Sequence, residues 1–257
     1  MQLAFEEFGA VDNPSLVVLH GFFASARNWR QIARMLAGRY HVLVPDLRNH
    51  GASPHDAVMD YPAMAADIVD FILQRQLQQV HLLGHSMGGK VAMWLALNEP
   101  ERAQSLIVVD IAPARYRHSF DNLITALRGL SLQDIGNRRE AEQLLENAIP
   151  DRSFRQFLLQ NLVLKDGHYH WRIDLEIFQR AAPAIIGFPD VQKVQPFDIK
   201  TLFLAGGTSH YLRSEDQPVI DRLFPAAEVV RLPDTGHWLH AEQPALFVAA
   251  VEKFLAE

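Results

Sequence analysis

The 257-residue sequence predicts an α/β fold, in which a mostly parallel central sheet is flanked by helices and interrupted by a helical insertion. Two patterns support this prediction. Short apolar runs alternate with helical segments over the first 110 residues, and this alternation stops there and resumes near residue 201. Such an alternation is typical of parallel strands joined by helices, and its interruption indicates an inserted segment.

Six apolar runs, rich in leucine and β-branched residues, have the length of buried strands. They cover residues 15–20, 41–46, 80–84, 105–110, 201–205 and 227–232. Helical patterns lie between the early runs, over residues 29–36, 62–74 and 88–97. We therefore expect a parallel sheet with helices on both of its faces.

The sequence after Asp110 has a different pattern. Apolar residues recur there at three-to-four spacing, which predicts helices over residues 123–130, 139–148, 154–164 and 175–182. Asp166-Gly167 predicts a turn between short extended pieces, the second of which ends at residues 169–172. We expect residues 1–112 and 198–257 to form the core, and residues 113–197 to form an inserted helical cap, or lid.

The composition excludes several classes of protein. The chain has no cysteine, which excludes disulfides, zinc–thiolate sites and cysteine nucleophiles. Its formal net charge is −6 and it has no large basic patch, so no nucleic-acid partner is expected. The late histidines have no carboxylates at metal-ligand spacing, and we expect neither a metal nor a cofactor.

The amino-terminal residues lack a basic region followed by a long apolar run, which predicts the absence of a secretory signal. No apolar stretch in the sequence approaches the ~20 residues needed to span a bilayer. We therefore expect a cytoplasmic protein, as a monomer or homodimer, without stable membrane insertion.

Residues 84–88 read Gly-His-Ser-Met-Gly and match the pattern Gly-x-Ser-x-Gly. A predicted strand leads directly into this segment and a predicted helix leads directly out of it. That context places Ser86 in a sharp turn, with its hydroxyl above the edge of the sheet. Glycines at positions 84 and 88 remove Cβ atoms that would clash where strand and helix backbones approach. We interpret Ser86 as a catalytic nucleophile.

A serine nucleophile requires two backbone N–H groups that stabilise the developing oxyanion. Met87 follows Ser86 at the amino terminus of the predicted helix, where the helix dipole also favours negative charge. The loop after the first predicted strand, His20-Gly21-Phe22, offers the second donor. We expect Phe22 N–H and Met87 N–H to form the oxyanion hole, with Phe23 N–H as the alternative to Phe22.

The general base is expected to be a late histidine, because this strand–turn–helix nucleophile is followed along the chain by the acid and then the histidine. His237 follows the last predicted strand and Gly236, which suits a loop that bends back over the sheet. It would take the proton from Ser86 and pass it to the leaving group. His240 is the alternative, and we expect it to pack against or cap the following helix.

Two carboxylates are candidates for the acid that orients His237. Asp110 stands at the end of a predicted strand, where it can accept a hydrogen bond from the histidine Nδ1–H and select its tautomer. Asp216 is the alternative, in the segment that follows the next strand. We prefer Asp110.

These motifs together resemble those of the α/β-hydrolase superfamily, and the resemblance covers nearly the whole chain. The matching segments are residues 20–22, 46–53, 84–89 and 236–237. The resemblance implies an α/β-hydrolase fold with Ser86 as the nucleophile. It disfavours dehalogenase and epoxide hydrolase activities, because those relatives have an aspartate at the position of Ser86.

Within the superfamily, the chain is similar to the YbfF-type bacterial esterases. The closer similarity lies in residues 48–51, 85–90, 109–113 and 236–241. It implies hydrolysis of carboxylic esters or acyl-CoA thioesters, and use of the aspartate that matches Asp110. Ser209 stands about where the wider superfamily has its acid, which also favours Asp110.

The insertion is expected to cover Ser86 as a lid, and aromatic side chains are expected to line an apolar acyl pocket. The substrate-binding candidates are Phe23, Trp171 and Trp238, together with Phe22, Met87 and Phe120. Lys90 lies in the first helical turn after Ser86. We expect it to pair with a nearby carboxylate, with binding of a substrate phosphate as the alternative.

The partner is therefore expected to be a small-molecule ester or acyl-CoA, cleaved through an acyl-Ser86 intermediate. Two other classes of function stay open. One is carbon–carbon hydrolysis or a lyase step at the same serine. The other is a receptor that binds a ligand on this scaffold without catalysis, although the presence of both Ser86 and His237 argues against it.

Overall fold

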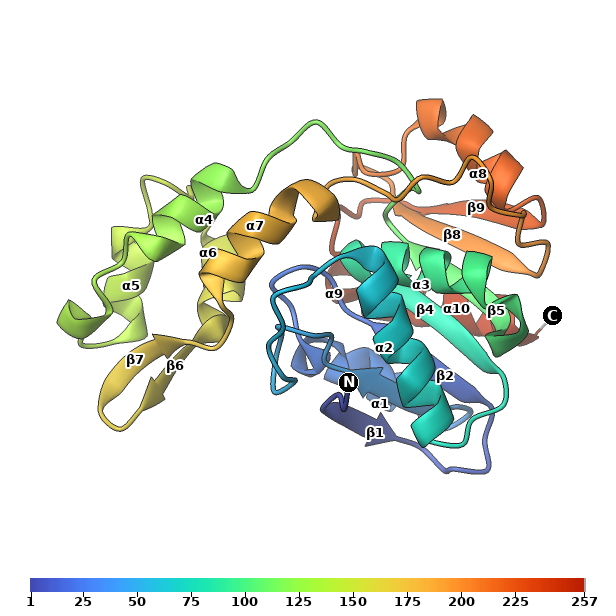
Figure 1. Cartoon of the computed structure of the whole chain (residues 1–257), viewed down its shortest axis with the longest axis horizontal. Coiled ribbons are helices and arrows are strands. Elements are labelled where there is room, and N and C mark those ends of the chain that lie inside the picture. Colours follow the sequence, from blue (N-terminus) through green and yellow to red (C-terminus); the bar gives the residue numbers. More distant parts are fainter. Residues whose placement is uncertain (257) are drawn as a thin grey trace.

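The computed structural model describes residues 1–256, and a seven-stranded sheet with helices on both faces forms its centre (Figure 1). The strand order is β1-β3-β2-β4-β5-β8-β9, and all neighbouring pairs are parallel except β1 with β3. The strands are β1 Phe5–Phe8, β2 Ser15–Leu19, β3 His41–Pro45, β4 Val80–His85, β5 Ala103–Val109, β8 Thr201–Gly206 and β9 Ala227–Leu232. All six predicted strands are confirmed. β1 is not predicted, because its sequence Phe-Glu-Glu-Phe lacks a continuous apolar run.

Successive strand residues face opposite sides of the sheet and belong to two separate apolar cores. Val17 packs on the side of α2 and α3, whereas its neighbour Val18 packs on the side of α1 and α10. The helices that flank the sheet are α1 Arg30–Leu36, α2 Tyr61–Gln74, α3 Met87–Asn98, α8 Gln217–Leu223, α9 Leu239–Glu242 and α10 Pro244–Ala256. The predicted cover on both faces is therefore confirmed.

A separate group of elements lies between β5 and β8 and extends beyond one end of the sheet (Figure 1). Its helices and strands are α4 Asp121–Arg128, α5 Arg138–Leu144, α6 Arg152–Leu158, β6 Leu162–Lys165, β7 His168–Trp171 and α7 Leu175–Ile185. Its buried side chains, such as Ile124 and Phe178, belong to the same apolar core as α2 and α3. The insertion is thus packed continuously onto one face of the molecule.

The prediction of one helix over residues 154–164 is wrong. Helix α6 ends at Leu158, and a 3₁₀ turn at Leu159–Asn161 leads into β6. The reason is the hairpin that follows, in which Asp166 and Gly167 both have positive φ, 52° and 80°. Such a pair matches the twist of two antiparallel strands, and β6 accordingly pairs with β7. The predicted Asp166-Gly167 turn is confirmed.

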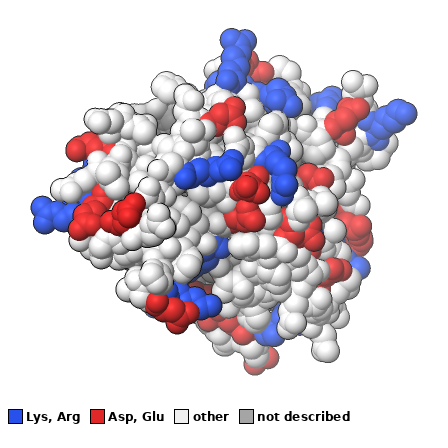
Figure 2. All heavy atoms as spheres, turned by 60° about the vertical axis from the view of Figure 1, so that its left-hand side comes forward, with Lys and Arg blue, Asp and Glu red and all other residues white. Residues whose placement is uncertain are grey.

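The side of the molecule that bears the insertion has a mixed surface charge. Figure 2 shows basic and acidic side chains interspersed on this side, among wide areas of other residues. Across residues 1–256, the model contains no helix with both the length and the apolar character required of a membrane span.

Backbone segments approach very closely where β4 enters α3. A Cβ atom on Gly84 would lie 2.2 Å from the carbonyl oxygen of Gly88, and one on Gly88 would lie 2.3 Å from that of Leu19. Both distances are far below van der Waals contact, and the obstructing atoms are backbone atoms that no side-chain rotation can move. The predicted need for glycine at positions 84 and 88 is therefore confirmed, and it fixes how β2, β4 and α3 meet.

We predict that Gly84→Ala destabilises the protein by at least ~1–3 kcal/mol, the usual range for an overpacked core. Gly38→Ala is the matched control, because a Cβ there meets nothing within 4 Å. Its effect should stay within about 0.5 kcal/mol. Urea unfolding of both variants measures the difference, and equal midpoints would contradict the close approach at Gly84.

Lys90 joins the two connections of the insertion to α3. Its side chain is buried, and Nζ donates to the carbonyl oxygens of Ala114 at 2.9 Å, Ile186 at 3.2 Å and Gly187 at 2.5 Å. The expectation that Lys90 pairs with a carboxylate is wrong, because carbonyl oxygens take all three of its protons. The same three bonds leave no proton for a substrate phosphate. Burial lowers the pKa of Lys90 to about 7.

This pKa predicts how stability depends on pH. Below pH 7, folded and unfolded chains both carry the Lys90 charge, and its burial destabilises the fold. Between pH 7 and about 10.5 only the unfolded chain keeps the proton, so stability should rise with pH, relative to Lys90→Met, by an amount on the order of 5 kcal/mol. Urea unfolding of both proteins across this range tests the prediction. Parallel stability curves would contradict it.

Candidate active site

Ser86 stands where the chain turns from β4 into α3. Its φ of 53° and ψ of −120° are strained for a residue with a side chain, at a cost of ~1–3 kcal/mol. Hydrogen bonds on both sides stabilise this conformation: Ser86 N–H donates to the Val109 carbonyl at 3.0 Å, and the Ser86 carbonyl accepts from Lys90 N–H at 3.2 Å. The Ser86 side chain borders a cavity of about 570 Å³. The strained turn therefore presents the serine to a cavity instead of packing it into the sheet.

The structure brings together the side chains of Asp110 and His237, which are 127 residues apart. Asp110 follows β5, His237 lies in the loop after β9, and His237 Nδ1 is 2.7 Å from Asp110 Oδ2. Because a carboxylate only accepts, the proton lies on Nδ1, and in the neutral ring Nε2 keeps the lone pair that a general base needs. The Asp110 side chain is fully buried, whereas that of His237 is 19% exposed and borders the same cavity as Ser86.

Two further donors hold the Asp110 carboxylate. Gly206 N–H, at the end of β8, donates to Oδ1 at 3.0 Å, and the Ser209 hydroxyl donates to Oδ2 at 2.5 Å. Asp110 itself has a positive φ of 50°, so its backbone is strained like that of Ser86. In the sequence, Ser209 is notable only because the wider superfamily has its acid at about this position. Its hydrogen bond to Asp110 could not be predicted from the sequence.

The alternative acid, Asp216, has a different partner. Its carboxylate accepts from Arg213 three times, from the backbone N–H at 3.0 Å, from Nε at 3.1 Å and from Nη2 at 3.0 Å. Both carboxylate oxygens are thus bound by a charged neighbour on the same turn. The geometry pairs His237 with Asp110 and leaves Asp216 with Arg213.

Two residues that the sequence does not single out position His237. The ring of Tyr211 stacks on that of His237, with centroids 4.0 Å apart and an interplanar angle of 23°. His85 contacts the backbone carbonyl of His237 through Nε2 at 2.8 Å. Burial, with His237 and His240 nearby, lowers the pKa of His85 well below its usual value, so its ring is neutral and donates this bond from Nε2.

His240, the alternative base, packs as expected. It is buried against Trp29, with stacked rings whose centroids are 4.3 Å apart. Burial lowers the pKa of His240 to about 3, which makes it a neutral ring at physiological pH. It has no carboxylate partner comparable to the one of His237 among residues 1–256.

The candidate oxyanion donors come from two segments that adjoin Ser86. Met87 is the first residue of α3, and the first N–H groups of a helix have no partner within it. Phe22 lies in the turn after β2, next to Gly21, where an added Cβ would be 3.3 Å from the Cβ of Ser86. Phe23 has a positive φ of 63°, and its carbonyl accepts from Asn161 of the insertion at 2.8 Å. This contact ties the loop to the insertion.

The cavity beside Ser86 is mainly apolar and aromatic. Helix α6 of the insertion supplies Phe154 and Phe157, whose rings lie 5.7 Å and 5.9 Å from that of Trp238. The phenylalanine, tyrosine and tryptophan residues that line it are Phe22, Phe23, Trp29, Phe120, Phe154, Phe157, Tyr211 and Trp238. Phe23, Phe120 and Trp238 are therefore where the sequence predicts them.

Trp171 is not brought to this cavity, and that prediction requires correction. It lies in β7, paired with Leu162, and lines a separate hollow together with Arg128. The reason is the β6–β7 hairpin, which the sequence pattern treats partly as helix. The predicted extended piece is present, but its pairing with β6 places Trp171 at the separate hollow.

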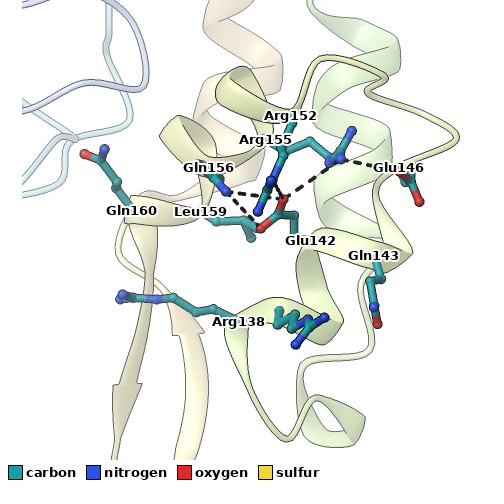
Figure 3. Close-up of a pocket in the computed structure, with 10 residues that line it drawn as sticks. Arg138, Glu142, Gln143, Glu146, Arg152, Arg155, Gln156, Leu159 and Gln160 are labelled. Carbon is teal, nitrogen blue, oxygen red and sulfur yellow. Dashed lines mark hydrogen bonds and ion pairs between the residues drawn. The ribbon is translucent and has the colours of Figure 1, made fainter.

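A larger hollow of about 880 Å³ lies in the insertion, on the other side of α6 (Figure 3). Its lining is charged, and its groups bind one another: Arg152 donates to Glu142 at 3.0 Å, and Arg155 donates to the Ile149 carbonyl at 2.6 Å. Gln160 borders both hollows and accepts from Asn28 at 3.0 Å. Helix α6 is therefore a wall with an aromatic side toward Ser86 and a charged side away from it.

A serine–histidine contact occurs within the sheet, away from Ser86. Ser105 Oγ lies 2.8 Å from His81 Nδ1, near the amino-terminal ends of β5 and β4, and both side chains are buried. Ser86 lies beyond the opposite ends of these strands. The Ser105–His81 contact therefore ties two strands together far from the cavity. Within residues 1–256, no three His, Asp or Glu side chains are grouped to hold a metal ion.

Comparison with known proteins identifies several relatives of similar length. The family model described as alpha/beta hydrolase fold matches residues 14–244. The sn-1-specific diacylglycerol lipase ABHD11 of Xenopus laevis is 42% identical, over 96% of this chain and 81% of its own length. The esterase YbfF of Escherichia coli K12 is 34% identical, over 95% of this chain and 94% of its own.

A solved structure has nearly the same fold. A marine microorganism esterase, 36% identical, superposes with a TM-score of 0.95 and covers 98% of this chain and 99% of its own. The predicted resemblance to YbfF-type esterases and the predicted ester-bond chemistry are both confirmed. The chain belongs to the α/β-hydrolase fold family, is close to the ABHD11 and YbfF esterase group, and is an ester-bond hydrolase.

Proposed function

We propose that the protein hydrolyses carboxylic esters, and acyl-CoA thioesters by the same steps, through an acyl-Ser86 intermediate. One observation carries this proposal: the strained Ser86 and the His237–Asp110 pair border a single apolar cavity. The cavity suits a substrate with a large apolar part. The names of the relatives, an esterase and a diacylglycerol lipase, support the same class of substrate.

Acylation begins when Ser86 Oγ attacks the carbonyl carbon of the substrate and its proton passes to His237 Nε2. Asp110 stabilises the imidazolium that forms, because its buried carboxylate already accepts the Nδ1–H at 2.7 Å. Phe22 N–H and Met87 N–H hold the oxyanion. The bond from the carbonyl carbon to the leaving oxygen or sulfur then breaks, and the leaving group takes the proton from His237 Nε2.

Deacylation repeats these steps with water. A water molecule attacks the acyl carbon while His237 Nε2 accepts one of its protons, and the bond to Ser86 Oγ breaks. The proton on His237 returns to Ser86. The net reaction converts an ester and water into a carboxylic acid and an alcohol, or a thioester and water into an acid and a thiol.

We also propose that residues 113–197 act as a lid on this site. Helix α6 supplies two aromatic walls of the cavity, and Asn161 binds the loop that carries the candidate oxyanion donor. Movement of the insertion would therefore change access to Ser86 and the shape of its cavity together.

We predict that a fluorophosphonate labels the folded protein at Ser86, because only an activated serine reacts with it. Ser86→Ala should lose the label. Ser105→Ala is the matched control: Ser105 contacts His81 but lies inside the sheet, so labelling should be retained. Intact-mass spectrometry measures the adduct. Unlabelled wild type, or labelling lost in the Ser105 variant, would overturn the assignment of the nucleophile.

We predict that Asp110→Asn lowers kcat on p-nitrophenyl esters by roughly 10⁴-fold, as an amide at this position favours the wrong histidine tautomer. Asp216→Asn should retain most of the activity, since this carboxylate is bound to Arg213. Circular dichroism checks that both variants fold. A large loss in the Asp216 variant alone would reverse the assignment of the acid. The same assay with acyl-CoA substrates compares esters with thioesters.

A further inference from the structure

Ser86 lies at the junction of two cavities of very different size. The larger one, about 570 Å³, is the aromatic cavity described above, and the smaller one measures about 30 Å³. Four residues border both: Phe22, Ser86, Phe120 and Tyr211. A substrate bound at Ser86 would therefore place groups in two compartments that admit different sizes.

The residues that border only one cavity show which part of the substrate each would take. His237 borders the large cavity and is absent from the described lining of the small one, whereas Met87 borders the small cavity. The leaving group must lie on the side of His237, because His237 Nε2 delivers its proton. In the tetrahedral intermediate the oxyanion points to the N–H donors. The remaining substituent of the carbonyl carbon is the acyl chain, and it is left with the small cavity.

We propose that the small cavity binds the acyl group of the substrate and the aromatic cavity binds its alcohol part, so that the enzyme selects short acyl groups, such as acetyl and propionyl, on large apolar alcohols. This inference rests on the proposed function, because it takes Ser86 as the nucleophile and His237 as the proton donor. It reverses the expectation that the aromatic residues line an acyl pocket.

The size of the small cavity limits the acyl group. A cavity needs about 10–15 Å³ of space to hold one water molecule, so a cavity of about 30 Å³ holds roughly two groups of that size. A methyl or ethyl group next to the carbonyl carbon fits, and a longer chain would have to displace the walls. Extra methylene groups in a site that cannot accommodate them reduce kcat/KM by ~10-fold or more each.

The walls of the small cavity are held in place. Tyr61 donates to the Ile185 carbonyl at 2.5 Å, and Tyr116 donates to the Tyr211 carbonyl at 2.5 Å while accepting from Ala112 N–H at 2.8 Å. Lys90 is fixed by its three carbonyl acceptors. The cavity therefore keeps its size, and it selects a small acyl group.

Two isomeric esters test the proposal directly on the full chain. Octyl acetate and ethyl octanoate have the same composition, with the long chain on the alcohol in one and on the acyl group in the other. We expect kcat/KM for octyl acetate to be at least about 10-fold higher, measured by acid release at constant pH. A preference for ethyl octanoate, or equal rates, would overturn the inference.

A variant of the small cavity gives the second test. Ile185→Ala enlarges the cavity and should raise the ratio of p-nitrophenyl butyrate to acetate hydrolysis by several-fold. Ile177→Ala is the matched control, since Ile177 is on the same helix, is buried to a similar extent and borders neither cavity in the described lining. If Ile185→Ala does not fold, Ile185→Val provides a smaller enlargement. An unchanged ratio in a folded Ile185 variant would contradict the proposal.

The fluorophosphonate test of the proposed function is independent of the ester test of the two cavities. Loss of fluorophosphonate labelling at Ser86 would overturn the proposed function, whatever the esters show. Labelled enzyme that hydrolyses long-chain acyl esters better than acetates would leave Ser86 as the nucleophile and reject only the assignment of the two cavities.

Discussion

Close backbone packing at the carboxyl-terminal edge of the sheet is the constraint on which the site depends. A Cβ on Gly84 would meet the Gly88 carbonyl, and one on Gly206 would lie 2.2 Å from the carbonyl of Gly236. The first contact forces the chain into the strained turn that carries Ser86. The second lets the loop before His237 cross the end of β8. Without these contacts, the serine and the histidine would belong to loops held apart by side chains.

Burial determines the chemical form of the histidines around this edge. It lowers the pKa of His20, His50, His85 and His240, so these rings are neutral and serve in packing and hydrogen bonding. His237 differs from them in its environment, because it is partly exposed and contacts the buried carboxylate of Asp110. His237 is thus distinguished from the other histidines by its contact with Asp110 and by its exposure to the cavity.

The insertion supplies part of the wall of the cavity beside Ser86. Helix α6 places aromatic rings on the side of Ser86 and keeps its arginines on the other side, in a hollow where they bind Glu142 and backbone carbonyls. The two connections of the insertion pass over Lys90, whose three hydrogen bonds hold them against α3. The small cavity beside Ser86 lies where these connections meet the core. Its size is therefore a consequence of how the insertion is attached.

The sequence by itself determined the sheet, its flanking helices and the identity of Ser86, His237 and Asp110 as candidates. These features depend on local patterns: apolar runs of strand length, a glycine-flanked serine between a strand and a helix, and polar residues at strand ends. Only the tertiary structure decided which carboxylate contacts His237: the strand-end position of Asp110 favours it, but the partners of Asp110 and Asp216 are set by contacts between distant segments or turns.

The tertiary structure also decided the surroundings of the site. The β6–β7 hairpin holds Trp171 away from the cavity beside Ser86. Ser209 contacts Asp110, and Tyr211 and His85 contact His237, although each pair is separated along the chain. The division of the space at Ser86 into a large and a small cavity arises in the same way. Residues far apart in the sequence enclose that space together, so a one-dimensional pattern contains no measure of its volume.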